Sequence, residues 1–171
     1  MTLTQIVFWT FSALAVLGAA MCITRRSPVA SALWLVQTLF ALAALFVVLD
    51  AQFVAVLQVL VYAGAIMVLF LFVIMLLNLG RPGPSDLKGP VGLAVATLLG
   101  GLLFFQLLRG ATPSAAGTPA GDTMAQLQQE QGIVGAVARP LFSQYLIPFE
   151  ITSVLLLAAI VGAVVLAKRK L

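Results

Sequence analysis

The sequence predicts an all-α membrane protein with five transmembrane helices. Of its 171 residues 63% are hydrophobic and 8% are charged, whereas ordinary soluble domains carry about 25% charged residues. Five runs are also continuously apolar over the roughly 20 residues that a helix needs to cross a bilayer, and they lack the alternation of membrane barrel strands. The expected spans, within one integral membrane domain covering 1–171, are residues 4–23, 29–49, 53–78, 90–108 and 147–167.

Basic residues predict how the helices are oriented. Seven of the nine Lys and Arg residues follow the first, third or fifth span, and an excess of such residues marks the cytoplasmic side of a membrane. We therefore expect a periplasmic N-terminus and a cytoplasmic C-terminus. Because the charges are scattered over short connections, the net charge of +4 is a topology signal and does not indicate nucleic-acid binding. The seven residues are Arg25, Arg26, Arg81, Lys88, Lys168, Arg169 and Lys170.

One connection is much longer than the others. Residues 109–132 are rich in Ala, Gly, Thr, Pro and Gln, and such a composition offers little apolar surface to offset the entropy of ordering. We expect a mobile outer loop there. Beyond it, apolar residues recur with helical spacing from Ile133 to Leu146 with an interruption at Pro140, which predicts one or two short helices at the membrane surface.

The chain lacks the residues of a resident redox or metal site. Cys22 is its single cysteine, it contains no histidine, and its acidic residues are scattered singly. Iron–sulfur clusters and zinc sites need several cysteine or histidine ligands. We therefore expect no metal site and no iron–sulfur cluster in this chain.

The third span is the one that indicates a specific function. Residues 53–77 carry no charge but include Gln58, Tyr62 and Gly64, and polar groups at this depth are costly and often functional. Tyr62 either bonds a neighbouring backbone carbonyl or lines a hydrated path. Gly64 either permits close helix packing or marks a backbone bulge. Gln58 is favoured as a helix–helix hydrogen-bonding group.

Three other polar residues are weaker candidates for a proton path. Gln37 lies near the middle of the second span, where hydrogen bonding between helices is the favoured role. Asp50 and Glu150 fall at the outer membrane edge, where water is available. For these two we favour structural roles, as a turn carboxylate and as a partner of the helix dipole.

Two segments of the sequence resemble a known family. QVLVYAGAIMVLF at 58–70, with FVIMLL at 72–77, resembles the third helix of subunit J of respiratory complex I, the proton-pumping NADH–quinone oxidoreductase. PFEITSVLLLAAIVGA at 148–163 resembles the last helix of that family, and Pro28 fits the start of its second helix. The family corresponds to the sixth NADH dehydrogenase subunit of mitochondria.

The resemblance implies a subunit of a translocase, in the bacterial inner (plasma) membrane, with no complete active site of its own. It would help to form and gate the hydrated proton path that couples quinone reduction to proton translocation. The flavin mononucleotide, iron–sulfur clusters and quinone would be held by partner subunits. The implied partners are the lipid bilayer and the other membrane subunits, especially the equivalents of K, H, A and N, with no homo-oligomer.

The family also implies which residues take part in gating. Its third helix tends to be interrupted by a π-bulge near the Tyr-Ala-Gly stretch, so the gating candidates here are Gln58, Tyr62, Gly64 and Val68, and irregular backbone bonding is expected from Tyr62 to Val68. Some bacterial relatives carry a glutamate where this chain has Gln58. A neutral amide cannot act as a charge-changing proton carrier, so no direct relay is expected there.

Two alternatives remain open at this level. One is the equivalent subunit of a related membrane-bound oxidoreductase that takes electrons from ferredoxin or a deazaflavin. This chain does not distinguish the two, because the electron donor binds to other subunits. The other is a small autonomous transporter or channel. Such a carrier would be expected to have an ionisable residue near the bilayer midplane, and in this sequence every Asp, Glu, Lys and Arg falls at or beyond a span end.

Overall fold

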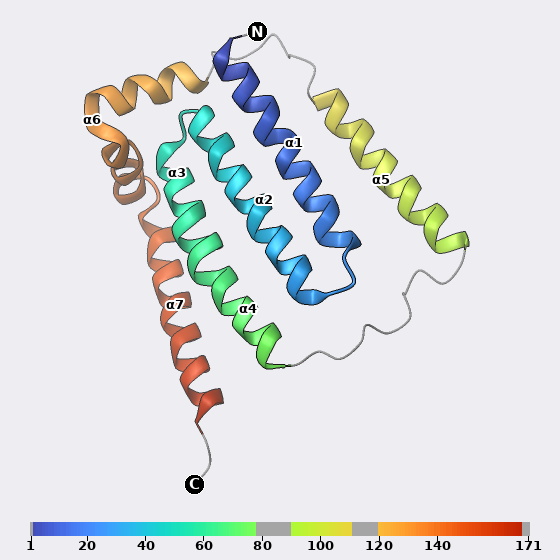
Figure 1. The fold of residues 1–171 in the computed structure, drawn as a ribbon. Coiled ribbons are helices and arrows are strands. Elements are labelled where there is room, and N and C mark those ends of the chain that lie inside the picture. Colours follow the sequence, from blue (N-terminus) through green and yellow to red (C-terminus); the bar gives the residue numbers. More distant parts are fainter. Residues whose placement is uncertain (1, 78–89, 111–119, 169–171) are drawn as a thin grey trace. The chain divides into compact units, whose positions relative to one another are not determined.

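The computed structural model describes residues 2–77, 90–110 and 120–168 (Figure 1). These residues form helices without strands, which confirms the all-α prediction for the described part of the chain. Contacts divide the chain into two units, Met1–Ala120 and Gly121–Leu171, where the sequence predicts one domain. The expected segment around Arg81 and Lys88 lies outside the described residues.

The first two helices form an antiparallel pair within the first unit (Figure 1). Helix α1 covers Leu3–Thr24 and α2 covers Pro28–Val48. The backbone N–H of Thr2 donates to the side-chain oxygen of Gln5 at 3.1 Å, which closes the start of α1. Pro28 occupies the first turn of α2, where its missing N–H costs no hydrogen bond.

A tight turn at Asp50 reverses the chain after α2. The N–H of Ala51 donates to the carbonyl of Phe46 at 2.9 Å, and the N–H of Asp50 donates to that of Val47 at 3.1 Å. This pair of bonds is the Schellman arrangement that ends many helices, and it places Asp50 in the left-handed region with φ 57°. The turn returns the chain directly along α2.

The next 25 residues form one apolar helical rod made of three parts. They are α3 (Gln52–Leu57), the π-helical segment η1 (Gln58–Ile66) and α4 (Met67–Leu76). The rod packs along α2 in a core formed by Ala32, Met67 and Ile74, with further apolar side chains around it. Because small residues line this contact, the two backbones approach closely.

Helix α5 covers Pro90–Gly110, and α6 covers Ala120–Ser143. The second of these differs from the sequence prediction, since residues 120–131 are helical where a mobile loop was expected. Ala, Gln, Glu, Met and Leu dominate that stretch, and they are good helix formers even where the apolar content is low. Residues 111–119 of the expected loop lie outside the described residues.

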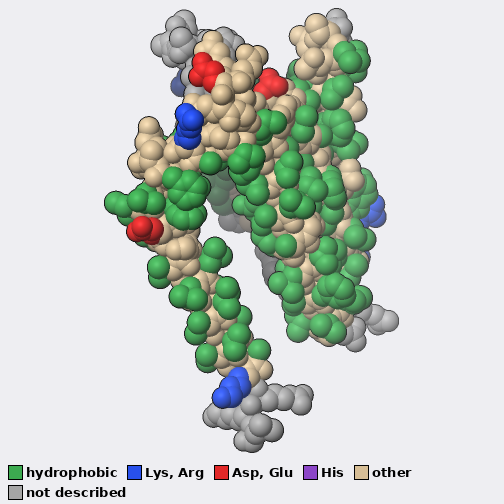
Figure 2. Space-filling model, turned by 90° about the vertical axis from the view of Figure 1, so that its left-hand side faces the viewer, with side chains coloured by type: hydrophobic (Ala, Val, Ile, Leu, Met, Phe, Trp, Pro, Cys, Tyr) green, Lys and Arg blue, Asp and Glu red, His purple; other side chains and the backbone are tan. Residues whose placement is uncertain are grey.

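Gly132 divides α6 into two helices. Its φ of 76° and ψ of 163° fall in a region that is essentially restricted to glycine. The second part, Ile133 to Ser143, leads within two residues into α7, which covers Leu146–Ala167. Figure 2 shows hydrophobic side chains along the sides of α7.

Four described helices are long and apolar enough to cross a membrane, namely α1, α2, the rod from Gln52 to Leu76, and α7. A shorter apolar helix, Ala94–Gly110, lies within α5. The apolar spans at these positions were predicted from the sequence, and the protein is a multi-pass membrane protein.

Candidate functional site

The candidate site is the π-helical segment of the third span. Residues Gln58–Ile66 are wound more loosely than an α-helix, and at its end the N–H of Met67 bonds to the carbonyl of Tyr62, five residues earlier. A π-helical turn is rare, costs hydrogen-bond regularity and occurs frequently at functional sites. Here it extends over nine residues in the middle of a membrane helix.

Gly64 is located where the widened turn leaves little room for a side chain. A Cβ atom built on Gly64 would lie 3.1 Å from the carbonyl oxygen of Val59, five residues earlier. That distance is tighter than most real contacts of a Cβ atom with an oxygen. Glycine is therefore the residue that this backbone accepts without adjustment.

The π-helical winding keeps one face of the rod against α2. Ala55, Ala63 and Met67 are all buried, and they follow one another at multiples of four residues. In a regular α-helix four residues exceed one turn by about 40°, so these twelve residues would turn the face away by about 120°. The looser winding compensates for that drift, and the buried small residues remain on α2.

The two polar side chains of the segment differ in how far they are covered by the rest of this unit. Gln58 is partly buried, whereas Tyr62 is 52% exposed. The ring of Tyr62 is therefore on the surface of this unit. In a membrane, a phenol in this position needs a polar partner from outside the described structure.

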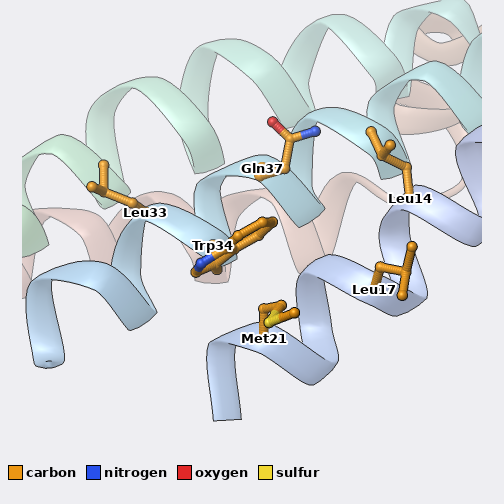
Figure 3. Close-up of a pocket in the computed structure, with 6 residues that line it drawn as sticks. All are labelled: Leu14, Leu17, Met21, Leu33, Trp34 and Gln37. Carbon is orange, nitrogen blue, oxygen red and sulfur yellow. The ribbon is translucent and has the colours of Figure 1, made fainter. Parts of the chain in front are cut away.

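Val68 and Gln37 line two separate grooves. Val68 is the second residue of α4 and lines a groove of about 250 Å³ with Val29, Leu71, Phe72 and Met75. Gln37 lines a groove of about 500 Å³ between α1 and α2, together with Trp34 of α2 and Met21 of α1 (Figure 3). The other residues around the Gln37 groove are Leu14, Leu17 and Leu33.

Asp50 belongs to the same unit as the π-helical segment, and Glu150 belongs to the other unit. Asp50 is exposed in the turn after α2, and Glu150 is exposed as the fifth residue of α7. The backbone carbonyl of Glu150 accepts a hydrogen bond from the Ser153 hydroxyl at 2.7 Å. The structure places Gln58, Tyr62 and Gly64 on one π-helical segment, with Val68 just beyond it.

Sequence reasoning missed the close crossing of α1 and α2. Gly18 and Thr38 are both buried there, and a Cβ atom on Gly18 would lie 2.6 Å from the Thr38 hydroxyl oxygen. The available signal was a pair of small residues three apart on each helix, with Ala15 before Gly18 and Ala41 after Thr38.

Among the described residues no group of three or more His, Cys, Asp or Glu side chains could hold a metal ion. The site thus consists of a loosened helix, two uncharged polar side chains and a glycine. Such a site can change shape and hydrogen-bond water, but it holds no group that changes charge near neutral pH.

Comparison with known proteins identifies the family. Residues 18–166 match the family described as NADH-ubiquinone/plastoquinone oxidoreductase chain 6. The chain belongs to this family. The matched range includes the whole π-helical segment, Gln37 and Val68, and the family resemblance inferred from the sequence is confirmed.

Individual relatives cover nearly the whole chain. NADH-quinone oxidoreductase subunit J of Pseudomonas aeruginosa is 37% identical over 96% of this chain and 97% of its own length. The subunit J of Rhodobacter capsulatus is 34% identical over 99% of this chain and 84% of its own length. F(420)H(2) dehydrogenase subunit J of Methanosarcina mazei is 32% identical over 95% of this chain and 89% of its own length.

Proposed function

We propose that this chain is the J-type membrane subunit of a proton-pumping NADH–quinone oxidoreductase. The observation that carries the proposal is its full-length similarity to subunit J of two bacterial NADH-quinone oxidoreductases. As a subunit it contributes to a translocase without a complete active site of its own. Its location is the inner (plasma) membrane of a bacterial cell, with the N-terminus periplasmic and the C-terminus cytoplasmic.

Within that complex, the role of the chain is to form and gate the hydrated proton path. The π-helical backbone from Gln58 to Ile66 supports this role, because a helix with one surplus residue per turn can return to regular winding. Such a return would turn the part beyond the segment by about 100°, the angle between successive residues of an α-helix. Val68 and the groove beside it would move with that part.

Tyr62 and Gln58 supply polar groups to the path in this proposal. Tyr62 is exposed within this chain, so a partner subunit or a chain of water molecules has direct access to its hydroxyl. Gln58 hydrogen-bonds water without carrying a charge. The proton would be carried by partner subunits or by water, while this helix sets whether the path is continuous.

The partners follow from the same assignment. The chain packs among the other membrane subunits, especially the equivalents of K, H, A and N. Flavin mononucleotide, iron–sulfur clusters and quinone are bound by partner subunits. The exposure of large apolar side chains along α7 and α4 supports extensive contacts with lipid and neighbouring helices.

The second candidate function is the same membrane subunit in a related complex with a different electron donor. The similarity to F(420)H(2) dehydrogenase subunit J favours considering a complex that takes electrons from a deazaflavin. The membrane role would be the same, because the electron donor binds other subunits. The two bacterial NADH-quinone oxidoreductase subunits are somewhat more similar to this chain, which favours NADH.

The direct test is gentle detergent extraction followed by mass spectrometric identification of everything that purifies with this chain. A large assembly with flavin- and iron–sulfur-containing subunits that oxidises NADH with a quinone is the expected result. An assembly that oxidises reduced deazaflavin instead of NADH would favour the second candidate. A homo-oligomer of this chain alone would overturn both.

A further inference from the structure

The surface helix that precedes α7 carries an apolar face that the proposed gating role does not use. It runs from Ile133 to Ser143, between the Gly132 break and the two residues before α7. Figure 1 shows α6 turning across the direction of α7 instead of extending it. A helix in this position meets the membrane at the level where α7 enters it.

The exposed apolar side chains of this helix lie on a different side from its polar side chains, and Ala136, on the side of Ser143, is buried. Successive residues are about 100° apart around an α-helix, so the exposed apolar residues occupy one half of its circumference and Arg139 and Ser143 lie on the other. An amphipathic helix of this kind rests in the plane of the membrane surface. The exposed apolar residues are Ile133, Val134, Val137 and Phe142.

The helix is fixed to the membrane span by direct contacts. The Phe142 and Phe149 rings meet edge to face at a centroid distance of 5.2 Å, which joins α6 to the first turn of α7. The N–H groups of Gln144 and Tyr145 both donate to the carbonyl of Pro140, at 2.8 and 3.1 Å. The apolar face of the helix is therefore continuous with the apolar surface of α7.

Arg139 has the chemistry to bind a phospholipid headgroup. Its side chain is exposed, and no ion pair to it is found among the described residues. A guanidinium group binds phosphate oxygens with two parallel hydrogen bonds. At the height of a helix that lies at the start of a membrane span, the phosphates of the lipid headgroups are the anions at hand.

We propose that residues 133–143 form a membrane-surface helix, with Val137 and its apolar neighbours in the acyl-chain boundary and Arg139 bound to the phosphate of a phospholipid headgroup. The proposal is independent of the gating role and of the electron donor. It makes the bilayer surface, and not a partner subunit, the occupant of this face.

The test uses the intact complex reconstituted in phospholipid vesicles, with Cys22→Ser as the background. The signal of the identically labelled background complex is subtracted, because partner subunits that hold iron–sulfur clusters also contain cysteines. A nitroxide spin label is attached to Val137→Cys in one sample and to Ser143→Cys, on the opposite side, in the other. Collisions with oxygen, which dissolves in hydrocarbon, are compared with collisions with a water-soluble nickel chelate. We expect oxygen to dominate at position 137 and nickel to dominate at position 143.

Other outcomes decide against the proposal. A label at position 137 shielded from both agents would show that a protein partner covers this face, and nickel access equal to that at position 143 would show a helix in water. Ile133→Cys, on the same face, repeats the measurement if Val137→Cys prevents assembly.

Arg139 is tested in the Val137→Cys protein by comparing Arg139→Gln with Arg139→Lys. If Arg139 binds the headgroup phosphate, the glutamine variant raises nickel access at position 137, and the lysine variant, which retains the positive charge, does not. No change with glutamine would remove Arg139 from the proposal. The NADH oxidation of each complex shows that assembly is intact.

Discussion

Thr38 of α2 lies directly against Gly18 of α1. A Cβ atom on Gly18 would meet the Thr38 hydroxyl oxygen at 2.6 Å and the backbone nitrogen of Thr38 at 3.5 Å. That hydroxyl donates to the carbonyl of Trp34 at 2.9 Å, one turn back on its own helix. The threonine is thus satisfied within α2, and the contact depends on shape and not on a bond between the helices.

Gly18→Ala should destabilise this crossing, because its methyl group has no space beside Thr38. Overpacking of this kind costs about 1–3 kcal/mol. The measurement is the temperature at which the purified complex loses this subunit. Thr38→Ala should restore stability to Gly18→Ala, whereas Thr38→Val, which replaces the oxygen by a methyl group, should not. Equal behaviour of the two double variants would contradict the steric explanation.

The turn at Asp50 allows a second prediction, because φ 57° is unfavourable for a residue with a side chain. Asp50→Gly should keep or raise the stability of the turn, since glycine adopts this conformation at no steric cost. Asp50→Val should lower it, because a β-branched residue is strongly disfavoured there. Thermal stability of the complex measures both, and a valine variant as stable as the glycine variant would refute this account.

The break in α6 should depend on Gly132. Its backbone angles are accessible to glycine alone, and no atom within 4 Å would obstruct a Cβ atom there. Gly132→Ala should therefore cost about 1–3 kcal/mol through backbone strain without any clash. Hydrogen exchange of the amides on both sides of the break should accelerate. Gly162→Ala, in an unobstructed position on α7, is the matched control and should leave exchange unchanged.

The membrane spans could be predicted because each one is a continuous apolar run whose required length is known. The bilayer thickness fixes about 20 apolar residues per helix, and the helices from Leu3 and Pro28 begin within one residue of the predicted starts. The helix at residues 120–131 was not foreseen, since the absence of apolar residues was weighed and the helix propensity of Gln, Glu and Ala was not.

Other features depend on pairs of residues that no single segment reveals. The fit of Gly18 to Thr38 depends on how two helices cross, and sequence alone does not give a crossing angle. In the third span, the polar Tyr62 and the small Gly64 indicated from the sequence where the helix would be irregular. The residue at which the π-helical winding begins, Gln58, depends instead on keeping Ala55, Ala63 and Met67 against α2. That requirement comes from packing and not from local preference.

The carboxylates of Asp50 and Glu150 should be dispensable for proton pumping. Asp50→Asn keeps a residue that tolerates the left-handed turn, and Glu150→Gln keeps the shape of an exposed side chain near the start of α7. Neither position is near the middle of an apolar span, so removing the charge should leave most quinone-linked activity and proton uptake intact. Both quantities are measured in membrane vesicles. Loss of proton uptake in a normally assembled Asp50→Asn complex would show that Asp50 carries protons.

Gly64→Val should lower the activity of the complex, unlike Asp50→Asn and Glu150→Gln. Its branched side chain would press on the carbonyl oxygen of Val59, already 3.1 Å from a bare Cβ atom, and would stiffen the segment proposed to change its winding. Quinone-dependent NADH oxidation and proton uptake should fall together. Oxidation of NADH with an artificial acceptor should survive, because that reaction uses the hydrophilic part of the complex.

Gly162→Val is the matched control for Gly64→Val. Gly162 also lies in a membrane helix, but no atom within 4 Å would obstruct its Cβ atom. The same substitution there introduces a β-branched residue without a close contact, so activity and pumping should stay near the unmodified level. If both valine variants lose activity equally, the effect comes from branching in a membrane helix and not from the π-helical backbone. If Gly64→Val pumps normally while Asp50→Asn does not, the chain is a proton carrier and not a gate.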